Sequence, residues 1–183
     1  MTQDSPSVLI SSQAISDRLD ELAAKIEEDY RDSPRLVCVG VLKGGVFFLV
    51  DLLRRIKRPL VVDFLQASSY GASTRPGEVH IIKDLDLPIA DADVLLIEDI
   101  VDTGNTLHSV VEMLKFRGAR SLRLCALLDK PSRREAHVDI DYLGFTIENV
   151  FVVGYGLDFD EHYRNLPYVG VLEESTILSR EVS

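Results

Sequence analysis

Three carboxylates stand close together in the middle of the sequence, at the end of an apolar run. Residues 94–97 read Val-Leu-Leu-Ile, and Glu98, Asp99 and Asp102 come after them. Carboxylate oxygens are ligands that Mg²⁺ prefers, and acidic side chains also accept hydrogen bonds from ribose hydroxyls in dinucleotide sites. The segment therefore predicts a site for a sugar, for a hard divalent cation, or for both.

The residues behind these acids have the composition of an anion-binding turn, which would be a phosphate cradle without Lys or Arg. Backbone N–H groups of a short glycine-containing turn can converge on one anion, and the N-terminus of a following helix adds further donors. Because two acids would repel a phosphate, a cation that bridges them removes the conflict. We therefore expect a phosphorylated ribose together with Mg²⁺; the alternative is an acidic loop that ends in a helix cap. The turn residues are Thr103, Gly104, Asn105 and Thr106.

The hydrophobic pattern predicts the elements that hold this segment. Nearly continuous apolar runs indicate strands that are buried on both faces, as in a parallel sheet, and helical spacing indicates amphipathic helices between them. We expect a cap at Ser11 or Ser12 and a helix stop at Gly118. The main strands are predicted at residues 35–42, 60–65, 93–97 and 122–128, and shorter ones at 80–83, 142–145, 150–155 and 169–172. The helices are predicted at residues 11–30, 46–57 and 106–116, with loops at 68–78 and 98–105.

Strands that alternate with helices are typical of a doubly wound α/β fold with a mainly parallel sheet flanked by helices. Such folds bind ligands beyond the carboxyl ends of the strands, which is where the three acids stand. The chain has 183 residues, which suits a single domain.

Composition excludes several classes of protein. The formal net charge of −10 disfavours non-specific binding to nucleic acid. No apolar run approaches the roughly 20 residues of a membrane span, and the N-terminal residues do not resemble a secretion signal. We interpret Cys38 and Cys125 as small buried hydrophobes in a reducing cytosol.

The segment at residues 94–106 resembles the 5-phosphoribosyl-1-pyrophosphate (PRPP) motif of the type I phosphoribosyltransferases. Four further pieces resemble one branch of that family, the hypoxanthine or hypoxanthine-guanine phosphoribosyltransferases of bacterial size, and the match spans about residues 35–172. These pieces are Leu-Lys-Gly-Gly at 42–45, Val-Asp-Phe at 62–64 with Ser-Tyr-Gly at 69–71, Leu-Leu-Asp-Lys at 127–130, and the run from Phe151 to Pro167.

The resemblance implies the fold, the reaction and the partners. We expect a core at about residues 35–130 and a small hood formed by about residues 1–34 and 131–183. The implied reaction joins N9 of a 6-oxopurine to C1′ of PRPP and releases pyrophosphate, with Mg²⁺ as cofactor. It also implies a dimer or tetramer of identical chains. From the cysteines, the net charge and the short apolar runs we expect a cytoplasmic protein that binds neither nucleic acid nor membranes.

The same resemblance places Asp102 beside N7 of the purine, where a carboxylate can act as general base. Adenine and orotate enzymes usually carry a non-acidic residue there, so Asp102 favours a 6-oxopurine. The alternative role for Asp102 is an N-terminal helix cap.

The remaining roles are carried over position by position. The phosphoribosyl group is assigned to Glu98, Asp99, Asp102, Thr103, Gly104, Asn105 and Thr106. Pyrophosphate is assigned to Lys43, Gly44 and Arg164, with a cis peptide bond expected between Leu42 and Lys43. The purine is assigned to Lys130, Phe151, Val152 and Asp158, the mobile lid to Ser69 and Tyr70, and Mg²⁺ to Glu98, Asp99 and Asp158.

Two positions depart from relatives, and two other functions remain open. Asn105 stands where related enzymes often carry Lys, and Gln66 lies near a site where some larger relatives have a basic residue. A transcriptional or RNA-binding regulator that senses PRPP is the main alternative, although the acidic net charge counts against it. A generic α/β nucleotide-binding module would leave Lys130 and the hood without a use. The preference among hypoxanthine, guanine and xanthine is not encoded in any recognisable motif.

Overall fold

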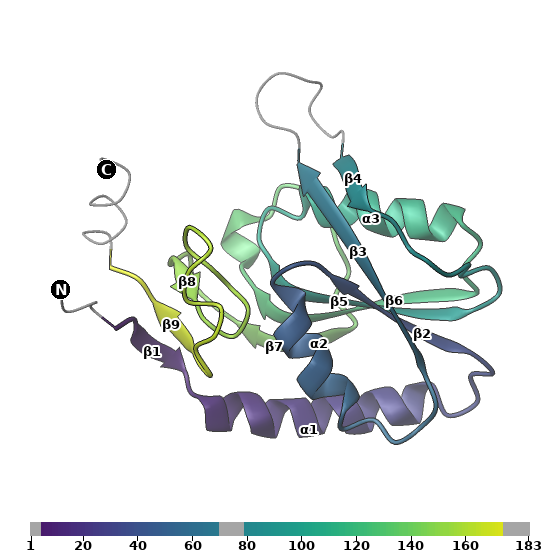
Figure 1. Cartoon of the computed structure of the whole chain (residues 1–183), viewed down its shortest axis with the longest axis horizontal. Helices are drawn as coiled ribbons and strands as arrows, with labels where there is room; N and C mark the ends of the chain where they lie inside the picture. The colour runs from purple at the N-terminus through teal and green to yellow at the C-terminus, as the bar shows by residue number, and fades with distance from the viewer. Residues whose placement is uncertain (1–4, 70–78, 174–183) are drawn as a thin grey trace.

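A six-stranded sheet forms the body of the molecule in the computed structural model, which describes residues 5–69 and 79–173 (Figure 1). The strand order is β4-β3-β2-β5-β6-β7, with all neighbours parallel except the β3–β4 pair at one edge. This confirms the predicted doubly wound, mainly parallel sheet. Its strands are β2 (Leu36–Val41), β3 (Val61–Ser69), β4 (Val79–Lys83), β5 (Asp93–Val101), β6 (Ser121–Asp129) and β7 (Tyr142–Thr146).

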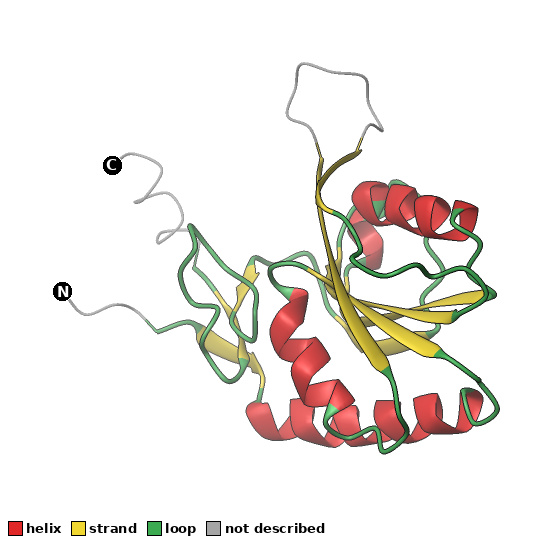
Figure 2. Cartoon of the chain, turned by 45° about the vertical axis from the view of Figure 1, so that its right-hand side comes forward, coloured by secondary structure: helices red, strands yellow, loops and turns green. Residues whose placement is uncertain are grey.

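Helices cover both faces of this sheet because its central strands are apolar on both sides (Figure 2). Leu95 and Ile97 of β5 pack in one hydrophobic cluster with residues of α1 and α2, whereas Val94 and Leu96 pack in a second cluster with residues of α3. The helices of the described residues are α1 (Ser12–Asp29), α2 (Gly45–Leu53) and α3 (Asn105–Phe116), and a 3-10 turn, η1, spans Pro131–Arg133.

A second, three-stranded sheet lies beside one end of the body (Figure 1). It has the order β1-β9-β8 and joins the two ends of the described chain, because β1 (Ser7–Ile10) pairs with β9 (Val169–Val171), which pairs with β8 (Val152–Val153). The described hood therefore consists of this sheet and the loops around it. Two segments that we had expected in the hood, α1 and β7, instead contact each other and belong to the body.

The element boundaries differ from the sequence predictions in ways that matter for the site. Strand β5 continues to Val101, so Glu98 and Asp99 lie on a strand and not in the predicted loop, because β6 pairs with β5 along its whole length. Helix α2 ends at Leu53, and β1 was not predicted because its exposed residues show no alternation. The predicted cap is confirmed at Ser11, which accepts a hydrogen bond from the Ala14 backbone N–H at 3.1 Å.

Both cysteines are buried and reduced, as expected from their apolar surroundings. Burial raises the pKa of the Cys38 thiol to about 12 and also raises the pKa of Cys125, so both thiols stay protonated at neutral pH. Across the described residues, no helix combines the length and apolar character needed to cross a bilayer.

Candidate active site

The C-terminal part of strand β5 presents two adjacent carboxylates, Glu98 and Asp99, which are half-buried. Burial raises the pKa of Glu98 well above its usual range, and the neighbouring Asp99 raises it further. Burial also raises the pKa of Asp99, although a hydrogen bond with Glu98 and the backbone N–H of Ile100 oppose the shift. The pair therefore carries electrostatic repulsion that a bound cation would relieve.

This donor set fits a hard divalent cation, since the two carboxylates present oxygen ligands and neither forms an ion pair with a described side chain. Among the described residues, no group of three His, Cys, Asp or Glu side chains comes together as a metal site. Asp158, the third ligand implied by the sequence, forms an ion pair of 2.9 Å with Arg164 and accepts the backbone N–H of Glu161.

The loop after β5 forms a small pocket of about 180 Å³ beside these acids. Gly104 has φ 84° and caps α3 through its backbone, so Asp102 does not serve as the helix cap that was its alternative role. A side chain on residue 104 would meet the Ala136 carbonyl oxygen at 2.7 Å, which adds a steric need for glycine to the conformational one. The pocket is lined by Glu98, Ile100, Val101, Asp102, Thr103, Gly104, Thr106 and Leu107.

The segment behind β6 brings three cationic side chains close to residues of this loop. Lys130 is buried, and burial lowers the pKa of its ammonium group, while the nearby Asp102 raises it. Arg133 donates a hydrogen bond to Asp102 at 3.0 Å. Arg134 pairs with Asp129 and lies against Gly104, so the predicted cradle without Lys or Arg has an arginine at its side.

The turn between β2 and α2 approaches the acids from the neighbouring strand. The Leu42–Lys43 peptide bond is cis, as the resemblance predicted. Gly44 packs against the carboxylate of Asp99, with no room for a side chain between them. Lys43 forms an ion pair of 3.0 Å with Glu161 of the hood.

The hood loop that follows β8 reaches over this turn. Gly156 has φ 103°, and a side chain on it would collide with the Gly44 carbonyl oxygen at 2.0 Å. Arg164 donates to the Gly156 carbonyl at 2.8 Å, while its Nε is buried with no hydrogen-bond partner among the described residues. The positive charge of Arg164 lowers the pKa of Asp99, which places the two groups within electrostatic reach.

The aromatic side of the hood lies at Phe151, next to β8. The Phe151 ring is 42% exposed and contacts Phe159 edge-on, with ring centroids 5.5 Å apart. Val152 is buried and pairs with Val171 of β9. Of the predicted lid, Ser69 ends β3, whereas Tyr70 and the other residues up to 78 lie outside the described part of the chain.

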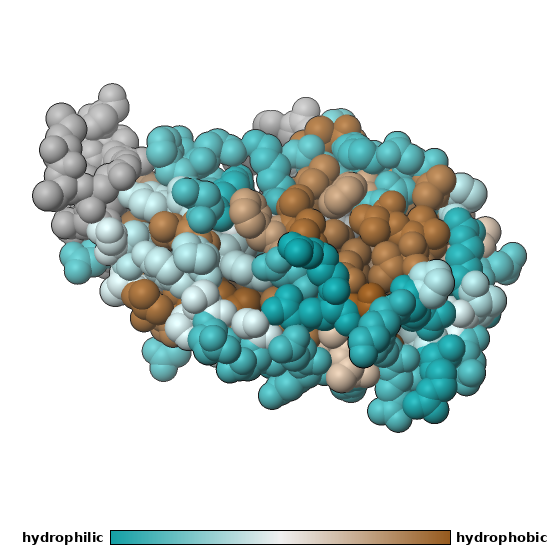
Figure 3. Space-filling model, turned by 60° about the horizontal axis from the view of Figure 1, so that its bottom comes forward, coloured by the Kyte–Doolittle hydropathy of each residue, from teal (hydrophilic) through white to brown (hydrophobic). Residues whose placement is uncertain are grey.

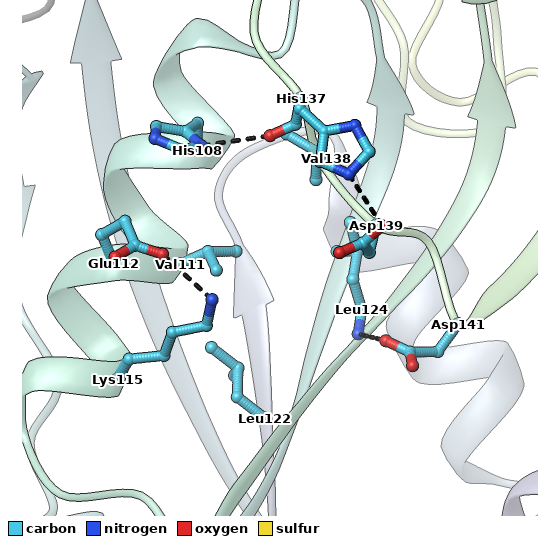
Figure 4. A pocket seen from close by; sticks show the side chains of 10 residues that line it. All are labelled: His108, Val111, Glu112, Lys115, Leu122, Leu124, His137, Val138, Asp139 and Asp141. Atoms are coloured by element: carbon cyan, nitrogen blue, oxygen red, sulfur yellow. Dashed lines mark hydrogen bonds and ion pairs between the residues drawn. The ribbon is translucent and has the colours of Figure 1, made fainter.

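Another cavity, of about 340 Å³, lies along α3 and is separate from the acids (Figure 4). Its polar groups largely satisfy one another: His108 contacts the His137 carbonyl oxygen at 3.1 Å, and Lys115 pairs with Glu112 at 3.0 Å. None of its lining residues is a glycine, and none belongs to the acid pair or to the turn at residues 103–106, so this cavity does not combine carboxylates with an anion-binding turn.

Three residues around the site were missed by sequence reasoning, namely Arg133, Arg134 and Gly156. The position of Arg133 and Arg134 shortly after Lys130 could have indicated their role, but a pair of basic residues is common on solvated surfaces. The contact of Gly156 with Gly44 joins residues far apart in sequence, so only the folded chain reveals it.

Comparisons with known proteins give consistent results. The family model described as the phosphoribosyl transferase domain matches residues 9–160. The hypoxanthine-guanine phosphoribosyltransferase of Staphylococcus epidermidis strain RP62A is 51% identical over 174 residues, covering 94% of this chain and 97% of that protein. The protein of the same name from Bacillus subtilis strain 168 is 48% identical, covering 94% and 96%. A crystal structure of a hypoxanthine phosphoribosyltransferase from Staphylococcus aureus superimposes with a TM-score of 0.89 at 48% identity, covering 93% of this chain and 92% of that one.

Proposed function

This chain belongs to the phosphoribosyltransferase family, among the hypoxanthine-guanine phosphoribosyltransferases, and we propose that it joins hypoxanthine or guanine to the phosphoribosyl group of PRPP. In this reaction N9 of the purine forms a bond to C1′, the bond from C1′ to the pyrophosphate oxygen breaks, and the N7 proton moves to the enzyme. The products are a nucleoside monophosphate and pyrophosphate, as in purine salvage.

One observation carries this proposal: a carboxylate of the acid pair and the glycine-containing turn line the same pocket. Glu98 lines it together with Thr103, Gly104 and Thr106. A ribose 5-phosphate presents hydroxyls to acids and a phosphate to backbone donors, so a single ligand satisfies both halves. We assign the phosphoribosyl group to these residues together with Asp99, Asp102 and Asn105.

We assign Mg²⁺ to Glu98 and Asp99, with Asp158 of the hood as a further ligand. When bound, the ion supplies positive charge that stabilises the leaving pyrophosphate. Lys43, the backbone of Gly44 and Arg164 bind the pyrophosphate on the protein's side. The position of the Arg164 guanidinium supports this role, because its charge lies within electrostatic reach of Asp99 and its planar fork suits phosphate oxygens.

The purine is proposed to lie between the segment behind β6 and the hood. Lys130 donates to O6, a contact that the amino group of adenine cannot accept. Phe151 offers an exposed ring for stacking, and the backbone near Val152 and Asp158 meets the N1 and C2 edge. Asp102 accepts the N7 proton, and Ser69 and Tyr70 contribute to the lid that excludes water.

We further propose that the enzyme acts in the cytoplasm as a dimer or tetramer. Its two buried free thiols suit a reducing compartment. Exposed apolar side chains occur on α2 at Phe47 and Val50 and on β3 at Val62, and hydrophobic residues gather on one side of the face drawn in Figure 3. Such exposure on a protein of this size favours contact with another subunit.

The direct test is incubation of the purified protein with PRPP, Mg²⁺ and one of hypoxanthine, guanine, xanthine or adenine. We expect pyrophosphate and the matching nucleotide to form in equal amounts with hypoxanthine or guanine, little product with adenine, and no turnover after chelation by EDTA until Mg²⁺ is restored. Absence of turnover with every 6-oxopurine would contradict the proposal. A PRPP-sensing regulator would instead bind PRPP without releasing pyrophosphate, so the same assay separates the two functions.

A further inference from the structure

Residues 133–137, which we call the clamp segment, contact the loop after β5 (residues 102–106) at almost every position. The backbone N–H groups of Glu135 and Ala136 both donate to the Thr103 carbonyl oxygen, at 2.9 and 3.1 Å. The Asn105 side chain donates to Glu135 at 2.7 Å, and His108 of α3 contacts the His137 carbonyl oxygen (Figure 4). The clamp segment is therefore held against the loop by main-chain as well as side-chain contacts.

Arg133, the first residue of the clamp segment, meets Asp102, the first residue of the loop. The Arg133 Nε donates to Asp102 Oδ1 at 3.0 Å. Among the described residues, this is the one side-chain hydrogen bond or ion pair in which Asp102 takes part. One carboxylate oxygen is thus occupied, and the other is left to accept a proton.

Both ends of this contact are fixed by the backbone. Asp102 directly follows β5, and the Lys130 N–H donates to the Val101 carbonyl at 3.0 Å, which ties the start of η1 to the end of that strand. The Arg133 N–H donates to the Lys130 carbonyl at 3.1 Å. Surface ion pairs contribute little when two long side chains must first be ordered. Here the backbone places both residues and the Asp102 side chain is short, so only the Arg133 side chain has to be ordered.

We propose that Arg133 is a positioning residue that holds the Asp102 carboxylate in the orientation needed to accept the proton from the purine. The inference rests on the proposed function, since it takes Asp102 as the general base. Arg133 reaches the reaction through Asp102 and does not touch the substrate. The charged groups around Asp102 are Arg133 and Lys130 behind β6 and Glu98 in the same pocket, while Asp129 is neutralised by Arg134.

The test compares Arg133→Met, Arg133→Lys and their combinations with Asp102→Asn. We expect Arg133→Met to lower kcat on the order of 10-fold while the KM for PRPP changes less than about 3-fold, because the backbone contacts of the clamp segment remain. Arg133→Lys should recover part of the lost kcat. In the Asp102→Asn background, Arg133→Met should lower kcat by less than about 2-fold, because the group that it orients is already gone.

The matched control is Arg31→Met. Arg31 is another exposed arginine that forms an ion pair with a carboxylate, that of Glu28, and it lies outside the site. Arg31→Met should leave kcat unchanged. The proposal is overturned if Arg133→Met leaves kcat unchanged, or if it lowers kcat by the same factor in the wild-type and the Asp102→Asn backgrounds. Thermal melting of each variant shows whether a loss of folding accounts for a lower kcat.

A second measurement needs no turnover. In ¹⁵N NMR spectra of the ligand-free protein, the Nε–H signal of Arg133, identified by its loss in Arg133→Met, should move when Asp102 is replaced by Asn. An unmoved signal would overturn the pairing even if the enzyme is active. An inactive wild-type protein with a moved signal would instead contradict the proposed function and the positioning role, but leave the contact itself established.

Discussion

Gly44 and Asp99 approach each other so closely that a Cβ on residue 44 would lie 1.5 Å from Asp99 Oδ2. The carboxylate cannot move freely out of the way, because its other oxygen accepts the Ile100 backbone N–H at 2.7 Å. The turn between β2 and α2 and the acid pair therefore form one packed unit, and Asp99 leaves no space for a side chain at position 44.

Replacing Gly44 by Ala should damage substrate binding more than folding. The added methyl group would push Asp99 from its place beside Glu98, and we expect the KM for PRPP to rise on the order of 10-fold or more. Steady-state kinetics at saturating purine measure this. The matched control is Gly118→Ala, where φ is 80° but the nearest atom to a new Cβ is 3.9 Å away. That variant should lose roughly 1–2 kcal/mol of unfolding free energy and keep its KM.

Asp102→Asn tests the proposed general base. Asn has the shape of Asp but does not accept a proton, so kcat should fall by roughly 10²- to 10⁴-fold. The KM for PRPP should change little, because the substitution leaves the backbone donors of residues 103–106 in place and α3 is capped by Gly104 and not by Asp102. A variant with near-normal turnover would show that the proton leaves the purine by another route.

Much of the fold was predictable because its signals are local. The continuous apolar runs of β2 and β5 predict buried strands, Ser11 predicts the start of α1, and Gly118 predicts the end of α3. Each of these depends on residues within one or two turns of the chain. Strand β1 was not predictable in the same way, since its pairing with β9 joins the two ends of the described chain.

The candidate site was predictable in its parts but not in its contacts. The types and spacing of Glu98, Asp99 and the turn behind them indicate a sugar phosphate and a cation. No local pattern indicates that Arg133 meets Asp102 or that Gly156 meets Gly44, because these contacts depend on how strands and hood come together. The extension of β5 through the acids likewise depends on its ladder with β6.

Replacing Lys130 by Arg should show how much of the pH dependence of purine binding comes from deprotonation of Lys130. Burial lowers the pKa of Lys130 below its usual value of 10.5, so the ammonium group loses its proton at a lower pH than an exposed lysine does. Affinity for the purine should therefore weaken as pH rises through the lowered pKa. Arginine stays charged across this range, so Lys130→Arg should lack that part of the pH dependence.

Isothermal titration of hypoxanthine in the presence of pyrophosphate and Mg²⁺, between about pH 7 and pH 10, provides the measurement. Ionisation of the purine itself affects both proteins equally and cancels in the comparison. If the affinity for hypoxanthine depends on pH in the same way in the two proteins, the Lys130 ammonium group does not donate a hydrogen bond to the purine. Lys130→Met should raise the KM for hypoxanthine on the order of 10-fold or more at neutral pH.

The stability of the fold should depend on Asp93 at acidic pH. Burial of this carboxylate would raise its pKa, but hydrogen bonds from Arg120 at 3.0 Å and Ser121 at 2.7 Å lower the pKa to about 2. Because the folded pKa lies below the ordinary value of 3.8, Asp93 stabilises the fold fully above that value, and the contribution is lost as pH falls toward 2. Urea unfolding at about pH 7, 5 and 3 measures the free energy of unfolding of the wild type and of Asp93→Asn. The difference between the two proteins should be the same at about pH 7 and pH 5 and smaller at about pH 3. Asp32 is exposed, so Asp32→Asn serves as the control and should have the same free energy of unfolding as the wild type at each pH. If the difference between wild type and Asp93→Asn is not smaller at about pH 3, the charge of Asp93 contributes nothing to the stability of the fold.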